Sequence, residues 1–220
     1  MLLVDSFSFW SQLTTEKKSL ENGLAFANTD VPFYLSNAFW HPSLENLADI
    51  LPWYEARQLP PAVIVPANKS DDLRSALLET NFTFELSFAF RKAQKSLDKT
   101  ITEQVNWTQM GYAGELLATY YEQPELAINI GKGLGEALQK DSNIKAFLSY
   151  EHEPVGTMII YQGETALSAM LLVDRDGALE HRLVTEAEIL GLDAYVLEPV
   201  VDEATSDPEL TLERWSIQST

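Results

Sequence analysis

The sequence predicts an α/β protein built on a mixed sheet, and three observations support this prediction. Residues 82–90 alternate apolar and polar side chains with the period of two that is typical of a strand. Residues 145–173 contain three apolar runs separated by two short turns, which predicts an antiparallel meander. Residues 177–190 then carry apolar side chains at helical spacing, so strands and helices alternate along the chain.

The other elements follow from the same signals. We expect a first group comprising helix 44–58, strand 62–65, helix 70–80 with Ser70 as its cap, and strand 82–90. We expect a second group comprising helices 112–121 and 124–140, strands 145–151, 155–161 and 165–173, helix 177–190, and strands 194–201 and 210–217. The helix over 177–190 should start at Asp176, end at Gly191 and bury a stripe of Leu179, Leu183, Ala187 and Leu190.

Both groups contain a strand–helix–strand unit, which predicts two halves of related architecture. Residues 91–106 are polar and carry several basic side chains, as expected of a connecting segment. We therefore expect a first half over residues 1–95, a connection over 96–106 and a second half over 107–220. No residue-by-residue repeat accompanies this architectural one.

The charge of the chain is negative and unevenly distributed. The net charge is −18, and residues 101–220 hold 6 basic and 21 acidic side chains against 9 and 12 in residues 1–100. Such a surface repels nucleic acid and polyphosphates, so we expect no nucleic-acid partner. Surplus acid keeps a protein soluble, and it also suits a partner with a basic surface or a small molecule that contains an amine.

Composition limits the remaining classes of protein. No apolar run approaches the roughly 20 residues of a membrane helix, so we expect no membrane partner. The chain contains no cysteine, which excludes thiolate chemistry and fits a cytoplasmic protein. The three histidines, His41, His152 and His181, are far apart in the sequence and predict no zinc site.

The run from Lys145 to Val173 carries a resemblance to a known family. It is similar to the central meander of the GNAT (GCN5-related) N-acetyltransferases, in which a turn followed by Pro-Val-Gly opens the second strand, as Pro154-Val155-Gly156 does here. The first half is similar to the degenerate first half of tandem GNAT proteins. The resemblance implies the acyl-CoA N-acyltransferase fold in two GNAT-like halves, with acetyl-CoA as the cofactor of an active member. It also implies two central parallel strands that separate to admit the pantetheine arm.

The pyrophosphate-binding loop that the resemblance implies departs from the family pattern Gln/Arg-x-x-Gly-x-Gly/Ala. With Arg175 in the first position, Ala178 and Glu180 stand where the glycines belong. The cofactor-binding candidates are therefore Arg175, Gly177, Ala178 and Leu179. Asp174, Asp176 and Glu180 place negative charge where a pyrophosphate would sit, so we expect no cofactor.

A second glycine-rich stretch offers an alternative phosphate loop. Gly131 to Leu138 would form a strand–loop–helix motif if residues 126–130 were a strand. A helix over 124–140 accounts for the same residues, because Leu126, Ile130, Leu134 and Leu138 fall on one helical face. We expect the helix, with no phosphate bound.

Candidate catalytic residues are Glu164, His181 and Tyr195. The resemblance implies a carboxylate base on a central strand and a late tyrosine acid, and Glu164 and Tyr195 are the nearest residues of those types. His181 is the histidine closest to the expected loop. None of the three occupies a motif position of the family.

Three functional interpretations remain open. The chain is a degenerate GNAT-like module that binds a ligand or partner, an active N-acetyltransferase that transfers an acetyl group from acetyl-CoA to an amine, or an acidic protein-interaction module. The sequence leaves open whether the chain assembles with copies of itself.

Overall fold

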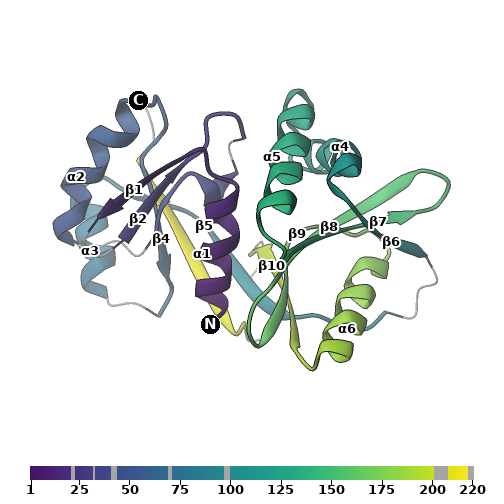
Figure 1. The fold of residues 1–220 in the computed structure, drawn as a ribbon. Helices are drawn as coiled ribbons and strands as arrows, with labels where there is room; N and C mark the ends of the chain where they lie inside the picture. Colours follow the sequence, from purple (N-terminus) through teal and green to yellow (C-terminus); the bar gives the residue numbers. More distant parts are fainter. Residues whose placement is uncertain are drawn as a thin grey trace. The chain divides into compact units, whose positions relative to one another are not determined.

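The computed structural model describes residues 1–20, 23–31, 33–40, 44–68, 71–96, 100–200 and 208–217. The chain divides into two compact units, which are described separately below. The α4–α6 unit consists mainly of Met1–Leu13 and Phe90–Glu198, and the β1–β4 unit mainly of Thr14–Ala89 and Leu210–Thr220. Figure 1 labels the helices and strands of both.

The α4–α6 unit contains five strands and four longer helices among its described residues. Its elements are α1 (Leu2–Gln12), β6 (Ile101–Val105), η2 (Trp107–Gln109), α4 (Met110–Tyr120), η3 (Pro124–Leu126), α5 (Ala127–Lys140), β7 (Ile144–Tyr150), β8 (Pro154–Gln162), β9 (Ala166–Val173), α6 (Ala178–Leu190) and β10 (Asp193–Pro199). The strands follow the order β10-β9-β8-β7-β6. Pairing is antiparallel from β6 to β9 and parallel between β9 and β10, which confirms the predicted meander.

Helices cover both faces of this sheet. Figure 1 shows α4 and α5 on one face and α6 on the other. Leu179, Leu183 and Ala187 of α6 are buried in a cluster with alternate residues of the strands, Phe147, Met158, Ile160, Leu167, Ala169 and Val196. Leu190, predicted to complete this stripe, is 42% exposed because it lies in the last turn, beyond the sheet contacts.

Glycines bring α4 and α5 close together. A methyl group at Gly114 would lie 2.7 Å from the backbone nitrogen of Gly131, and one at Gly131 would lie 2.7 Å from the carbonyl oxygen of Met110. Residues 127–140 are helical throughout, so the alternative strand–loop–helix motif at Gly131 is wrong. The glycines allow the two helix backbones to approach each other, which explains their number.

The β1–β4 unit is a second sheet structure with two longer helices in its described part. Its elements are β1 (Glu16–Leu20), β2 (Gly23–Ala27), η1 (Tyr34–Ser36), β3 (Phe39–Trp40), α2 (Leu44–Glu55), β4 (Ala62–Pro66), α3 (Asp71–Glu79), β5 (Thr83–Lys92) and β11 (Leu210–Ser216). The strands follow the order β1-β2-β3-β4-β11-β5, and β5 ends in the other unit. β3 and β4 are parallel, whereas β11 is antiparallel to β4.

Only part of the apolar face predicted for residues 82–90 is buried. Phe82, Phe88 and Phe90 are buried, but Phe84 is 52% exposed. Its ring meets Trp215 edge to face, with 5.7 Å between the ring centroids. The predicted cap of α3, Ser70, and the histidine His41 lie outside the described residues.

The units are not contiguous in sequence, so their boundaries differ from the predicted division at 95 and 107. Residues 1–13 belong to the α4–α6 unit, where α1 contacts β8 and β9. Residues 210–216 form β11 and pair with β4 of the β1–β4 unit, although the sequence placed them in the second half. The expected connection over 96–106 contains the strand β6. No helix in the described ranges is both long and apolar enough to span a membrane.

Candidate functional site

Two carboxylates occupy the amino end of α6. The Asp174 Oδ2 atom accepts a hydrogen bond from the backbone N–H of Glu180 at 2.9 Å. The Asp176 Oδ1 atom accepts one from the backbone N–H of Ala178 at 3.1 Å. Free amides of a first helical turn are what an anionic ligand would bind, because they have no partner within the helix. Here the side chains of the preceding loop fill that role.

Arg91, Gln94 and Thr100 bind two acids at this end of α6, Glu180 and Asp176. The guanidinium of Arg91 donates to both carboxylate oxygens of Glu180 at 2.5 and 3.0 Å, and to Glu198 at 2.9 Å. The backbone N–H of Gln94 donates to Glu180 at 2.6 Å. The Thr100 hydroxyl donates to Asp176. Sequence reasoning placed these three residues in a connection and missed their role; the charges of Arg91 and Glu180 were the signal available.

The two loop carboxylates differ in proton affinity. Burial raises the pKa of Asp174, and the neighbouring Asp176 adds to the rise, while the amides of Glu180 and Leu179 oppose it. The pKa of Asp176 is lowered, mainly by the hydrogen bond from Thr100. Asp176 therefore keeps its negative charge more readily, and Asp174 takes up a proton first when the pH falls.

Gly177 shapes the entry to α6. It is the N-cap residue and has a φ of 77°, in the left-handed region that side chains disfavour. A methyl group there would lie 3.1 Å from the Ser96 Cβ atom. The predicted cap Asp176 is one residue earlier, although its side chain does reach an amide of the first turn. The predicted end at Gly191 is confirmed, with a φ of 68°.

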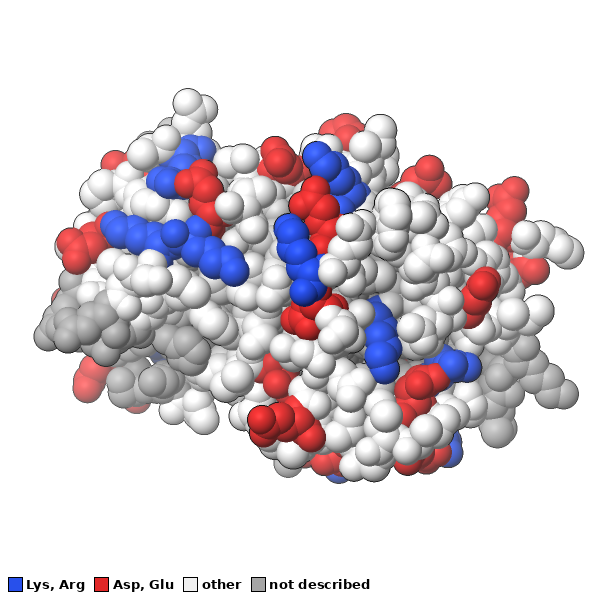
Figure 2. All heavy atoms as spheres, viewed as in Figure 1, with Lys and Arg blue, Asp and Glu red and all other residues white. Residues whose placement is uncertain are grey.

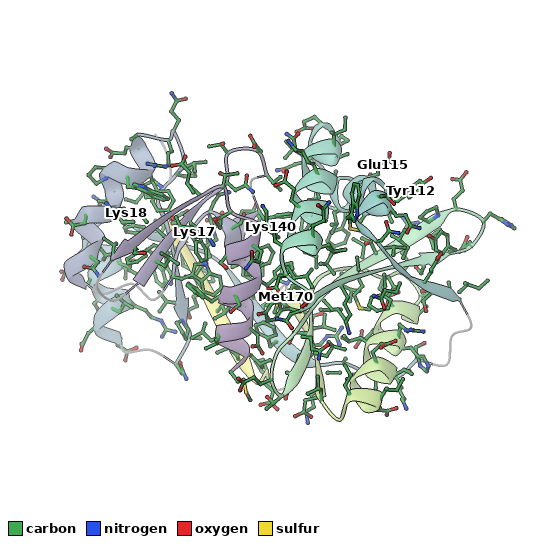
Figure 3. All side chains as sticks on the ribbon, in the orientation of Figure 1. Lys17, Lys18, Tyr112, Glu115, Lys140 and Met170 are labelled. Carbon is green, nitrogen blue, oxygen red and sulfur yellow. The ribbon has the colours of Figure 1, made fainter. Side chains whose placement is uncertain are left out.

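β9 and β10 pair over only part of their length. Their parallel register runs from Asp193 opposite Ala166 to Val196 opposite Ala169, although both strands continue beyond it. On its other side β9 has an irregularity at the same level, because Ile159 and Ile160 of β8 lie opposite Leu171 and Ala169. Met170, labelled in Figure 3, is the extra residue of this bulge. A bulge bends its strand and increases its twist, which explains why the pairing to β10 stops here.

A cavity of about 920 Å³ lies at the carboxyl end of β9. One helical face of α4 forms one wall, since Tyr112, Glu115, Leu116, Thr119 and Tyr120 all line it. Figure 3 labels Tyr112 and Glu115 on that helix. The other walls come from the β7–β8 hairpin and the start of the β9–α6 loop, with the residues Tyr150, His152, Glu153, Pro154, Val173, Asp174 and Arg175.

The cavity combines acids with aromatic side chains. Glu115, Glu153 and Asp174 contribute negative charge against the positive charge of Arg175. Burial raises the pKa of Tyr150, with Glu103 and Tyr112 adding to it, so its hydroxyl stays protonated and can donate. Outside the cavity, the acidic side chains on the face shown in Figure 2 form small separate groups rather than one continuous surface.

The predicted catalytic residues do not come together. Glu164 is exposed in the β8–β9 turn, at the opposite end of β9 from the cavity and roughly 25 Å away along the strand. Tyr195 is 8% exposed on β10, opposite Ser168, and burial raises its pKa. His181 lies in the first turn of α6, where its Nδ1 atom is buried without a hydrogen-bond partner in the described part of the chain. None of the three lines the cavity.

The predicted cofactor-binding residues do lie near one another. Arg175 lines the cavity, Gly177 caps α6, and Ala178 and Leu179 are buried in its first turn. His152 also lines the cavity, from the β7–β8 hairpin. Among the described residues, no three His, Asp or Glu side chains gather closely enough to hold a metal ion.

Comparison with solved structures shows what the fold is similar to. A GCN5-related N-acetyltransferase from Kribbella flavida matches with a TM-score of 0.66, 11% identity, and coverage of 100% of this chain and 95% of that one. A conserved protein of unknown function from Staphylococcus epidermidis matches with a TM-score of 0.65, 12% identity and coverage of 93% and 94%. A putative acetyltransferase from Pyrococcus horikoshii matches with a TM-score of 0.58, 12% identity and coverage of 98% and 78%.

The sequence itself matches nothing comparable. A scan against models of known protein families and a search of curated proteins both find no match. At 11–12% identity the structural likeness concerns the fold alone. The predicted mixed α/β sheet with a GNAT-like fold is thus confirmed.

Proposed function

We propose that this chain, whose fold is that of the GCN5-related N-acetyltransferases, does not hold acetyl-CoA at the amino end of α6 and works as a ligand-binding module. The observation that carries the proposal is the occupation of the first-turn amides by Asp174 and Asp176. A pyrophosphate would have to replace two carboxylates that stay covalently tethered beside it.

Electrostatics supports the same conclusion. Coenzyme A carries a pyrophosphate and a further phosphate, so its site must offer several donors and positive charge. The α6 end offers Asp174, Asp176 and Glu180, and the nearby cation Arg91 is already paired with Glu180 and Glu198. Each charge-assisted hydrogen bond that is lost costs about 1.5–3 kcal/mol, so losing several should weaken binding by orders of magnitude.

Calorimetric titration with acetyl-CoA tests the proposal. We expect no saturable heat up to about 1 mM ligand, at about 20 mM and about 150 mM salt, because repulsion persists under both conditions. A parallel assay for coenzyme A release in the presence of assorted amines should show no turnover. A micromolar Kd, or enzyme-dependent release of coenzyme A, would overturn the proposal.

A variant connects the result to the proposed cause. Replacing both loop acids, in Asp174→Ala with Asp176→Ala, frees two amides and removes two negative charges. We expect measurable acetyl-CoA binding in this double variant once its folding has been checked by circular dichroism. The exposed Glu125, in η3, supplies the control: Glu125→Ala removes a negative charge elsewhere and should leave acetyl-CoA unbound.

One observation favours the alternative of an active N-acetyltransferase. The bulge at Met170 and the end of β9–β10 pairing after Ala169 give the separation of parallel strands that the family resemblance implies. An acyl chain could enter there even if the pyrophosphate were held differently. The same titration decides between the two functions, because only the enzyme requires acetyl-CoA to bind.

A further inference from the structure

We infer that the cavity between α4 and the β7–β8 hairpin binds a small organic cation whose charge is a tertiary or quaternary ammonium group. The inference rests on the proposed role of the chain as a ligand-binding module and names the ligand class. The cavity, at about 920 Å³, falls within the roughly 300–1,000 Å³ of small-molecule sites. It therefore accommodates the ammonium group together with a larger molecular body.

The charge of the lining selects a cation. Glu115 and Glu153 line the cavity and make no ion pair with any residue that the structure describes. Asp174 adds negative charge, and its Oδ2 atom is already engaged by the Glu180 amide. Arg175 is the one Lys or Arg side chain among the lining residues, and it leaves the balance negative with His152 counted as neutral. A negative field in a partly enclosed site attracts cations and repels anions.

Aromatic side chains select the type of cation. Tyr112, Tyr120 and Tyr150 line the cavity, and Tyr112 and Tyr120 keep 52% and 55% of their surface exposed. Tyr112 and Glu115 lie one helical turn apart on α4, so a ring and a carboxylate project from the same face. Tyr112 is also close enough to Tyr150 to affect it electrostatically, which brings two rings to the same region.

The strength of hydration distinguishes tertiary and quaternary ammonium groups from primary ones. A primary ammonium has three N–H donors and is strongly hydrated, so it needs three well-placed acceptors to leave water. A tertiary ammonium has one N–H donor and a quaternary ammonium has none, so each costs less free energy to dehydrate. Such groups are recognised by aromatic faces together with a nearby negative charge. The lining of rings and carboxylates matches the second type. A quaternary ammonium has no N–H to acetylate, which agrees with a role in binding rather than transfer.

Three ligands with the same hydroxyethyl group test the inference by calorimetry on the full chain. Choline carries the quaternary charge, 3,3-dimethylbutan-1-ol has the same shape without charge, and ethanolamine has a primary ammonium. We expect choline to bind with a Kd of about 1 mM or tighter, and each of the other two to bind at least about tenfold more weakly. No choline binding up to about 10 mM, or equal binding of all three ligands, would overturn the inference.

Matched variants locate the site. Glu115→Gln and Tyr112→Leu change exposed side chains of the cavity wall, and each should weaken choline binding about fivefold or more. Glu125→Gln removes an exposed acid outside the lining and should leave the Kd unchanged. Choline binding that Glu115→Gln and Tyr112→Leu do not affect would contradict this site. Acetyl-CoA is titrated separately, so its binding would refute the proposed function while leaving the choline result to be judged independently.

Discussion

The side chain of Asp174 accepts a hydrogen bond from the backbone N–H of Glu180, six residues later, across the start of α6. The side chain of Glu180 is in turn held by Arg91, which arrives from β5. The helix end is therefore closed from both directions by groups of the chain itself.

Gly177, at the start of α6, is expected to be required because its φ is left-handed and because a side chain there would crowd Ser96. Gly177→Ala should lower the free energy of unfolding by about 1–2 kcal/mol from left-handed strain, plus a further loss from crowding against Ser96. Gly191→Ala is a matched control, because it has a similar φ and no atom within 4 Å of the added methyl group. Thermal unfolding of both variants measures the difference. Equal losses would mean that the Ser96 contact contributes nothing.

The Arg91 ion pairs are expected to stabilise the α4–α6 unit. The Arg91 side chain is 20% exposed and contacts two carboxylates, so Arg91→Met should cost about 2 kcal/mol and lower the Tm by roughly 4–8 °C. Lys95 and Glu188 form a comparison pair at 51% and 58% exposure, and Lys95→Met should cost less than about 1 kcal/mol. Similar changes in Tm for the two variants would contradict the assigned role of Arg91.

Asp5 is expected to reduce stability at neutral pH. It is 6% exposed, its Oδ2 atom has no hydrogen-bond partner in the described residues, and burial raises its pKa despite the opposing charge of the N-terminus. The folded state therefore binds the proton more tightly than the unfolded state. Stability falls as the pH rises from the ordinary aspartate pKa near 3.8 through the raised value.

Asp5→Asn removes that effect. At pH 7 the free energy of unfolding of the variant should be about 1–3 kcal/mol higher than that of the unmodified chain, and its Tm a few degrees higher. Both differences should shrink as the pH falls towards about 4. Glu164 contributes to the raised pKa of Asp5 but is itself exposed, so Glu164→Gln should give a smaller change. A pH-independent difference between Asp5→Asn and the unmodified chain would refute the explanation.

Gly114 and Gly111 of α4 are expected to respond differently to substitution, because only a methyl group at Gly114 would meet α5. Gly114→Ala places a methyl group against the backbone of α5, so the helices must separate at a cost of about 1–3 kcal/mol. Gly111→Ala meets no atom within 4 Å and should stabilise α4 by about 0.5–1 kcal/mol. Denaturant unfolding that shows a gain for Gly114→Ala would mean that the helices are not closely packed.

The strongly periodic elements were predictable from the sequence because their signals are local. The meander over 145–173 appears as β7, β8 and β9, and the helix over 177–190 as α6, within a residue or two at each end. The short helix α1 was missed, because neither a capping side chain at its start nor a basic residue in its last turn marks its ends. Strand β6 was missed because it is exposed and polar at most positions, with the burial that marks a strand only at Val105.

The site was less predictable because it depends on contacts between distant residues. The sequence indicated that Asp174, Asp176 and Glu180 crowd the α6 end, and this part is confirmed by their positions. It indicated Asp176 as a cap, but not that Asp174 also holds an amide of the first turn, or that Arg91, 89 residues earlier, balances Glu180. The cavity likewise combines α4 with a hairpin some thirty residues later, a proximity that no local pattern encodes.

The sequence separation between α1 and the strands that it contacts has a consequence for synthesis on the ribosome. These strands, β8 and β9, follow about 150 residues later, which at ordinary rates of elongation is roughly 8–30 s. During that interval α1, which buries Phe9 and Trp10 in the folded protein, is present without β8 and β9. The strand β4 waits in the same way for β11, its antiparallel partner, which is synthesised much later. Each unit is thus completed only when its later strands have been synthesised, and until then α1 presents an apolar face that a chaperone can bind.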